Sequence, residues 1–248
     1  RTDLSPADRE RVRAVTTPTT DFSKPERFER MAGGAATSTA ALDSNAFSHP
    51  STNLSFEGRQ NFFVGTGLYK KLWVSSPAST AASDGLGPLF NARGCQRCHL
   101  KDGRGHPPSG PDDVAVSMLI RLSLAPATDA ERQALQSLDT LRIAEPTYGG
   151  QLQDFAVPGL PAEGRVRIEY EEFDVDLNGG EVATLRKPIL SIDDLGYGPM
   201  ADGVMTSARI ANQMIGLGLL DSIHPADMMA LADPHDADGA GISGRPSV

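Results

Sequence analysis

The chain contains only two cysteines, and both lie in the segment Cys95-Gln96-Arg97-Cys98-His99. Two thiols separated by two residues and followed directly by a histidine form the attachment signature of c-type haem. Each thiol can form a thioether with one haem vinyl group, and the imidazole of His99 can then bind the iron from one face. We therefore interpret Cys95, Cys98 and His99 as the site of one covalently attached haem.

Three other interpretations of the cysteine pair are weaker. A structural zinc site needs two further ligands, normally a second cysteine pair, which this chain does not contain. A thioredoxin-type redox pair opens a helix within a βαβ unit, and the flanking sequence has no such pattern. A disulfide that closes so short a loop would be strained.

Composition and charge argue against some classes of function. The 248 residues carry a net charge of -9 without a dense run of Lys or Arg, which argues against a nucleic-acid partner. No apolar run approaches the roughly 20 residues of a membrane span. Haem c is normally attached after export, and residues 1–15 have no apolar segment of the signal-peptide type. We therefore expect a periplasmic protein whose signal peptide has been removed.

Local patterns predict a mainly α fold with long loops and one β-hairpin. Residues 1–54 are polar and are expected to form an extended wrap, with a short helix starting after Ser5. Amphipathic or capped helices are expected after Ser55, after Thr128 with Glu131 as its capping-box partner, within residues 207–223, and after His224. Residues 116–124 are interpreted as an apolar strand or buried segment. Apolar and polar residues alternate near residues 164–190, and together with the turn Asn178-Gly179-Gly180 this pattern predicts an inserted hairpin there.

The second axial position of the iron has several candidates. Met205, Met214 or His49 could bind from the face opposite His99, and Met200 is a further downstream methionine. Each methionine is individually more typical of core packing. His106 is expected in a turn too close to the cysteine pair to cross the ring.

Two further sites are suggested by charged residues. Asp233, Asp236 and Asp238 alternate within a glycine-assisted turn, as oxygen ligands do in calcium loops, although no Glu closes the loop as in an EF-hand. A calcium site and a solvated acidic turn are equally compatible with this segment. Arg209 could pair with a haem propionate, and a surface salt bridge is the alternative.

Longer stretches around these residues resemble one known family. They are NAFSHPSTNLSFEGRQNFFVGTGLYKKLWVSSPAST, DGLGPLFNARGCQRCHLKDGRGHPP, YGGQLQDFAVPG, MIGLGLLDSI and DPHDADGAGISGRP. From about residue 28 onward the chain is similar to the di-haem oxidoreductase family, often labelled thiol oxidoreductase, a distant relative of the bacterial di-haem cytochrome c peroxidases.

The resemblance implies a cytochrome c-like haem domain over residues 55–232, in which Cys95, Cys98 and His99 match the N-terminal haem site. It also implies a second Cys-x-x-Cys-His site, which this chain lacks, so residues 233–248 are expected to be an acidic loop leading to a missing second haem domain. The related peroxidases bind calcium between their halves, which favours the calcium interpretation. The implied partners are an electron-donor protein or that second domain, together with a small oxidant such as peroxide.

Three functions therefore remain open at the sequence level. The chain is expected to be a peroxidase-like half-enzyme, whose general acid or base would be an acidic residue such as Glu145, Asp154 or Glu169. The alternatives are a non-catalytic electron carrier, with Met or His as sixth ligand, and a binding module for iron handling.

Overall fold

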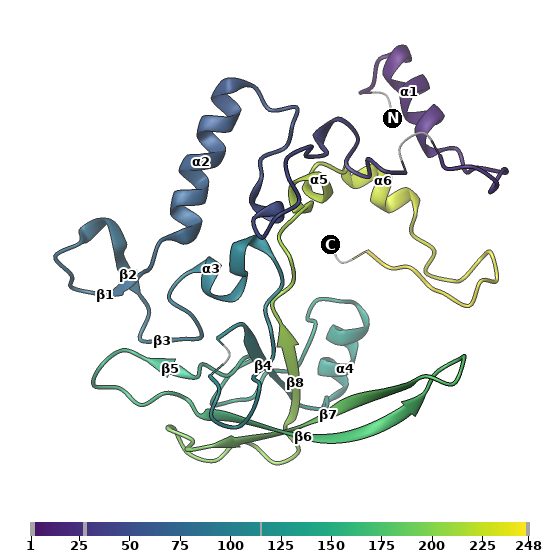
Figure 1. The fold of residues 1–248 in the computed structure, drawn as a ribbon. Coiled ribbons are helices and arrows are strands. Elements are labelled where there is room, and N and C mark those ends of the chain that lie inside the picture. Colours follow the sequence, from purple (N-terminus) through teal and green to yellow (C-terminus); the bar gives the residue numbers. More distant parts are fainter. Residues whose placement is uncertain (1–2, 27–28, 115, 247–248) are drawn as a thin grey trace. The chain divides into compact units, whose positions relative to one another are not determined.

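The computed structural model describes residues 3–26, 29–114 and 116–246. The chain divides into two compact units, the first made of residues 1–62 and 215–248 and the second of residues 63–214 (Figure 1). The cysteine pair lies in the second unit.

The first unit contains short helices whose ends are capped as the sequence suggests. In α1 (Pro6–Thr16), the Ser5 hydroxyl accepts the Asp8 N–H, and in α6 (Pro225–Ala230) the His224 ring accepts the Ala226 N–H. The remaining elements are η1 (Gly34–Ala36), η2 (Ala46–Ser48) and α5 (Leu217–Asp221). The helix α2 (Phe56–Lys70) starts in the first unit and ends in the second.

The second unit is organised around pairs of strands. The parallel pair is β1 (Val74–Ser75) with β2 (Asp84–Leu86). The antiparallel pairs are β3 (Leu89–Phe90) with β5 (Phe155–Ala156), β4 (Met118–Ser123) with β8 (Met205–Ile210), and β6 (Arg165–Asp176) with β7 (Val182–Asp193). The helical elements are η3 (Ala81–Ser83), α3 (Cys95–Cys98), η4 (Leu100–Asp102) and α4 (Asp129–Gln136).

The core of this unit forms around β4. Its residues alternate between buried and half-buried, so Met118, Ile120 and Leu122 face the interior while Leu119 and Arg121 face away. Other buried apolar side chains come from outside the strand: Tyr148, Leu152 and Ile168. The cluster thus joins the β4–β8 pair to the base of the β6–β7 hairpin.

The expectation of a mainly α fold is wrong. The described residues are 25% helix and 22% strand, and the longest helix among them, α2, has 15 residues. Part of the error lies in residues 207–223, whose spacing predicted a helix. Ser207 to Ile210 instead belong to β8, because pairing with β4 satisfies their backbone groups beside the apolar core, and tertiary pairing overrides local helical preference. Only α5 is helical there.

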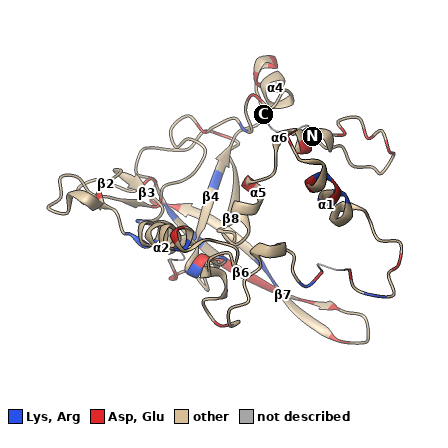
Figure 2. Ribbon diagram, turned by 90° about the horizontal axis from the view of Figure 1, so that it is seen from above, with Lys and Arg blue, Asp and Glu red and all other residues tan. Residues whose placement is uncertain are grey.

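The expected hairpin near residues 164–190 is formed by β6 and β7, each 12 residues long. Gly179 and Gly180 both have positive φ, as the tight turn requires. Charged residues of both signs lie along β6 and β7 (Figure 2), and Arg167 pairs with Asp193 at 2.6 Å.

Two other expectations from the sequence concern a helix cap and membrane-spanning helices. The capping box of Thr128 and Glu131 at the start of α4 is confirmed, with both reciprocal hydrogen bonds present. No helix among residues 3–26, 29–114 and 116–246 has the length and apolar character that a bilayer crossing requires.

Candidate haem site

The two cysteines occupy a single helical turn. Because α3 runs from Cys95 to Cys98, their side chains are three residues apart on one helix and project from the same face. Both thiols are free, Cys95 being exposed and Cys98 half-buried with its Sγ 3.2 Å from the Val116 carbonyl oxygen. They are therefore available to bind a common group.

The position of this turn is fixed from its N-terminal side by the segment that follows α2. Trp73 donates its backbone N–H to the Arg93 carbonyl at 2.8 Å, and the Arg93 guanidinium donates back to the Trp73 carbonyl at 3.0 Å. Gly94 packs so closely that a Cβ there would overlap the carbonyl oxygen of Lys71. A glycine directly before Cys95 is thus required for this close approach of two backbones.

The imidazole of His99 is oriented by a backbone carbonyl. Its Nδ1 lies 2.6 Å from the carbonyl oxygen of Asn212. Since a carbonyl oxygen can only accept, Nδ1 carries the hydrogen, and in the neutral ring Nε2 is left with the lone pair. A donated Nδ1–H to a carbonyl is the usual outer-sphere arrangement of a metal-binding histidine.

The chain after β8 holds this carbonyl in place. Gly105 donates to the Ala211 carbonyl at 2.8 Å, Ala211 donates to the Ser117 carbonyl at 2.9 Å, and Met214 donates to the Asp102 carbonyl at 2.8 Å. Asn212 therefore lies in a segment bonded on both sides to the loop that follows His99.

Tyr69, near the end of α2, lies close to the cysteine pair. Burial raises its pKa to about 12, with further contributions from Asp102, Cys95 and Cys98. Its buried hydroxyl has no hydrogen-bond partner among the described residues. Two free thiols, an imidazole with a free Nε2 and this unpartnered hydroxyl form a donor set that fits a covalently attached porphyrin.

A half-buried carboxyl, Asp154, lies near Cys98. Burial raises the pKa of Cys98, and the charge of Asp154 raises it further, which indicates that the two groups are close. The carboxylate of Asp154 accepts from Asn91 Nδ2 at 2.8 Å, and the same amide donates to the Leu152 carbonyl at 2.7 Å. Gln151 in turn donates to Asn91 Oδ1.

The pairing of β3 with β5 brings Asn91 and Asp154 together. Phe90 of β3 pairs with Phe155 of β5, and their rings stack with centroids 5.9 Å apart. Asn91 directly follows β3 and Asp154 directly precedes β5, so the pairing brings the amide to the carboxyl. Since Asn91 is four residues before Cys95, its hydrogen bond to Asp154 connects the cysteine segment to this carboxyl.

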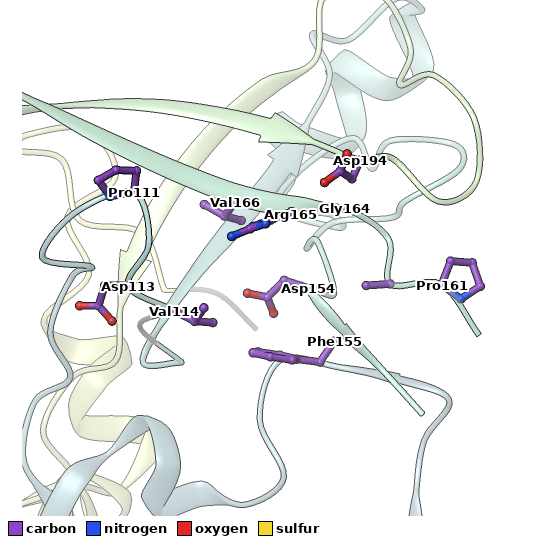
Figure 3. A pocket seen from close by; sticks show the side chains of 11 residues that line it. Pro111, Asp113, Val114, Asp154, Phe155, Pro161, Gly164, Arg165, Val166 and Asp194 are labelled. Carbon is purple, nitrogen blue, oxygen red and sulfur yellow. The ribbon is translucent and has the colours of Figure 1, made fainter. Parts of the chain in front are cut away.

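Asp154 also lines a cavity of about 370 Å³ (Figure 3). In that view it lies in the middle of the lining residues, between Arg165 and Phe155. Burial raises the pKa of Asp154, and the hydrogen bond from Asn91 partly offsets this. A carboxyl with a raised pKa in a cavity is typical of proton-transfer sites.

The other two acidic candidates have different surroundings. Glu145 is buried, and its carboxylate accepts from the backbone N–H groups of Thr147, Tyr148 and Ala201 at 2.6–2.8 Å. Burial raises the pKa of Glu145, but these hydrogen bonds outweigh it and the net shift is downward. Glu169 is exposed on β6 opposite Ile189. Of the three, only Asp154 combines a cavity with a raised pKa.

The candidates for the second axial position are dispersed. Met205 is 49% exposed on β8 opposite Ser123, and Met200 packs against the core. Met214 is half-buried two residues after Asn212, whose carbonyl holds the Nδ1 side of His99. His49 lies in the first unit, where it lines a cavity of about 270 Å³ and its buried Nε2 has no partner among the described residues.

Arg209 is exposed on β8 opposite Leu119 and forms no ion pair with any described residue.

The acidic tail forms a loop in which three carboxylates lie close together. Asp233, Asp236 and Asp238 each offer a carboxylate oxygen, and these atoms lie within 4.8 Å of one another. Asp233 also accepts the Ala237 N–H at 2.9 Å, which curls the loop.

Sequence reasoning missed three residues of this region. Tyr69, Asn91 and Gln151 carry no motif of their own, and their roles depend on contacts across 60 residues or on burial. The only signal was indirect, since all three lie within stretches that resemble the di-haem oxidoreductases.

The two free thiols and the oriented imidazole are the groups that a covalently attached haem would require. The chain matches the family described as "Di-haem oxidoreductase, putative peroxidase" over residues 28–247 and belongs to it. The family name implies a haem cofactor and an oxidoreductase activity. No curated protein and no solved structure is significantly similar to the chain.

Proposed function

We propose that this chain is a periplasmic haem c oxidoreductase domain that reduces peroxide or a similar small oxidant. The observation that carries the proposal is the pairing of His99 Nδ1 with the Asn212 carbonyl beside two free thiols. That arrangement leaves Nε2 directed away from the carbonyl, as an iron ligand requires. When bound, haem supplies an iron that exchanges single electrons.

Each residue of the site would contact the cofactor in a different way. Cys95 and Cys98 would hold a haem through two thioethers, each formed by addition of the S–H across one vinyl group. His99 would bind the iron through Nε2, with its ring orientation set by the Asn212 carbonyl. The unpartnered hydroxyl of Tyr69 would be available to donate a hydrogen bond to a group bound beside the cysteines.

Asp154 acts as the general acid and base of the reaction. Reduction of a peroxide consumes two electrons and two protons and yields an alcohol or water together with one water. A carboxylate near the O–O bond can accept a proton from one oxygen and return it to the oxygen that leaves. Asn91 keeps the Asp154 carboxylate oriented by donating to its Oδ1 at 2.8 Å.

The electrons must come from outside this chain's own residues. A di-haem family implies a second haem, so we propose that an electron-donor protein or a second haem domain supplies them. The acidic surface, with a net charge of -9, suits a donor that presents basic residues.

The test is a spectrum of the protein purified from a host that matures c-type cytochromes. We expect a high-spin haem whose spectrum shifts on addition of peroxide, and a shift at least tenfold slower in Asp154→Asn. A six-coordinate low-spin spectrum that peroxide does not change would instead identify an electron carrier and overturn the proposal.

A further inference from the structure

The cavity lined by His49 and Arg59 points to a binding site for a phosphate group. We infer this from the hydrogen-bond donors, the charge and the size of the cavity. All residues of the site lie in the first unit, so the inference is independent of the haem site and of the proposed function.

The walls of the cavity come from two segments that are hydrogen-bonded to each other. Thr52 donates its backbone N–H to the Ala36 carbonyl at 3.2 Å and its hydroxyl to the Thr37 carbonyl at 2.7 Å. These bonds hold the chain after Thr37 beside the chain after His49. Four of the residues that line the cavity carry hydroxyl groups, two from each segment: Ser38, Thr39, Ser51 and Thr52.

The cation of the site is Arg59, in the first turn of α2. The Ser55 hydroxyl accepts the Gly58 N–H at 3.1 Å and the Ser55 carbonyl accepts the Arg59 N–H at 3.0 Å, so the start of the helix fixes this position. The Arg59 guanidinium lines the cavity, and its Nη2 lies 3.4 Å from the Thr52 carbonyl oxygen. It forms no ion pair with a carboxylate of the described residues. Its planar fork of N–H donors matches two oxygens of a phosphate group.

His49 contributes a ring nitrogen that lacks a hydrogen bond. Its Nε2 is buried and has no partner among the described residues, whereas buried polar atoms are normally paired. A ligand in the cavity that His49 lines would supply the partner. Hydrogenphosphate offers acceptor oxygens and one O–H donor, so it can bond to Nε2 in either tautomer of the ring.

The charge of the cavity favours an anion. The whole chain has a net charge of -9, yet none of the described residues that line this cavity is acidic. Glu57, the acidic residue of α2, is two positions from Arg59, and residues at this spacing do not face each other on a helix. The hydroxyl groups of the walls can each turn an O–H toward an anion.

The size and arrangement of the cavity favour a compact tetrahedral group. Its volume is about 270 Å³, below the ~300 Å³ at which pockets for drug-sized organic molecules begin. Hydroxyl groups from two segments and a guanidinium from a helix supply donors from several directions. A phosphate group directs its oxygens to several sides, whereas a carboxylate accepts in one plane. The donors of this cavity therefore suit a phosphate group better than a carboxylate.

The test is calorimetric titration of the full chain with inorganic phosphate in a calcium-free buffer. We expect one site, with binding weakened at least tenfold in Arg59→Gln and also weakened in His49→Gln, because each variant removes a donor or acceptor of the site. The matched controls are Arg30→Gln and His235→Gln, at exposed positions of the same unit outside the cavity, and they should bind as the wild type does. Acetate should bind at least tenfold more weakly than phosphate.

The ¹⁵N resonance of His49 Nε2 gives a second readout. It should shift when phosphate is added to the wild type or to Arg30→Gln, and the shift should be lost in Arg59→Gln at the same phosphate concentration. Glycerol phosphate distinguishes the source of the group: tighter binding of the ester identifies a phosphomonoester as the ligand, and tighter binding of the free ion identifies inorganic phosphate.

Three results would overturn the inference. They are the absence of both a heat of binding and a shift of the His49 resonance, equal phosphate affinity of Arg59→Gln and Arg30→Gln, and tighter binding of acetate than of phosphate.

Discussion

The Nδ1 atom of His99 lies 2.6 Å from the carbonyl oxygen of Asn212, a residue 113 positions away in the chain. The cysteine motif predicts which residues would bind a haem, and this hydrogen bond sets the orientation and tautomer of the His99 ring. Because the acceptor is a backbone carbonyl, its function is independent of the side chain of Asn212. The segment after β8 therefore belongs to the site as much as the motif does.

Substitution of Asp154 by Asn should lower kcat/KM for peroxide reduction by about 10²-fold or more, the contribution typical of a general acid or base. Burial raises the pKa of Asp154, so the wild-type rate should fall as the pH drops through a value above the ordinary 3.8. This acid limb should be absent in the variant. Asp112→Asn, an exposed neighbour of the cavity wall, is the control and should retain the wild-type pH profile.

The same substitution should stabilise the fold at neutral pH. A carboxyl whose folded pKa is raised adds stability below its unfolded pKa, and this contribution is lost as the pH rises through the folded pKa. Asp154 is therefore unfavourable when ionised, and Asp154→Asn removes the penalty. Urea denaturation at pH 7 should give a higher free energy of unfolding for the variant, and a lower one would contradict the assignment.

Glu145 should be essential for stability. Substitution by Gln replaces one of its two acceptor oxygens by an NH₂ group that faces backbone N–H donors, which should cost about 3 kcal/mol in urea denaturation. The folded pKa of Glu145 is lowered, so its stabilising effect is present above an unfolded pKa near 4.5 and is lost as the pH falls through the folded pKa. The difference between the proteins should shrink in acid. Glu169→Gln, at an exposed position, should change stability by less than ~0.5 kcal/mol.

Gly94→Ala should displace the cysteine turn, because the added Cβ would overlap the Lys71 carbonyl oxygen. We expect a destabilisation of about 1–3 kcal/mol and a lower haem content per chain. Gly87→Ala is the control, since its Cβ would lie 3.7 Å from the Leu89 carbonyl oxygen, an ordinary contact. Equal haem content in the two variants would contradict the proposed role of Gly94.

The acidic tail should bind calcium if the three carboxylates act together. Calorimetric titration of the full chain with Ca²⁺ should give one site, and Asp236→Asn should weaken binding at least tenfold. Asp221→Asn, outside the cluster, should not. Titration without heat of binding would identify residues 233–241 as a solvated turn.

The sequence predicted local structure better than the fold class. The capping box of Thr128 and the glycine turn of the hairpin depend on residues close together in the chain, and local chemistry suffices to recognise them, whereas the haem site at the cysteine motif stays a prediction. The mainly α prediction failed where distant pairing decides the structure, as in β8, which pairs with β4 across more than 80 residues.

Contacts between residues that are distant in the sequence also explain why the sequence alone could not identify the general acid or base. Glu145, Asp154 and Glu169 are equivalent in sequence, and only burial and partners separate them: three backbone donors for Glu145, a cavity and Asn91 for Asp154, and solvent for Glu169. Tyr69 was missed for the same reason, since nothing in its local sequence indicates a buried hydroxyl without a partner.

We propose that Cys95 and Cys98 hold one haem covalently, with His99 on its iron. This is best tested by an intact-mass measurement of the protein from a host that matures c-type cytochromes. We expect a mass increase equal to one haem, abolished when both cysteines are replaced by Ser. A colourless protein with the mass of the bare polypeptide, or with a disulfide between Cys95 and Cys98, would contradict it.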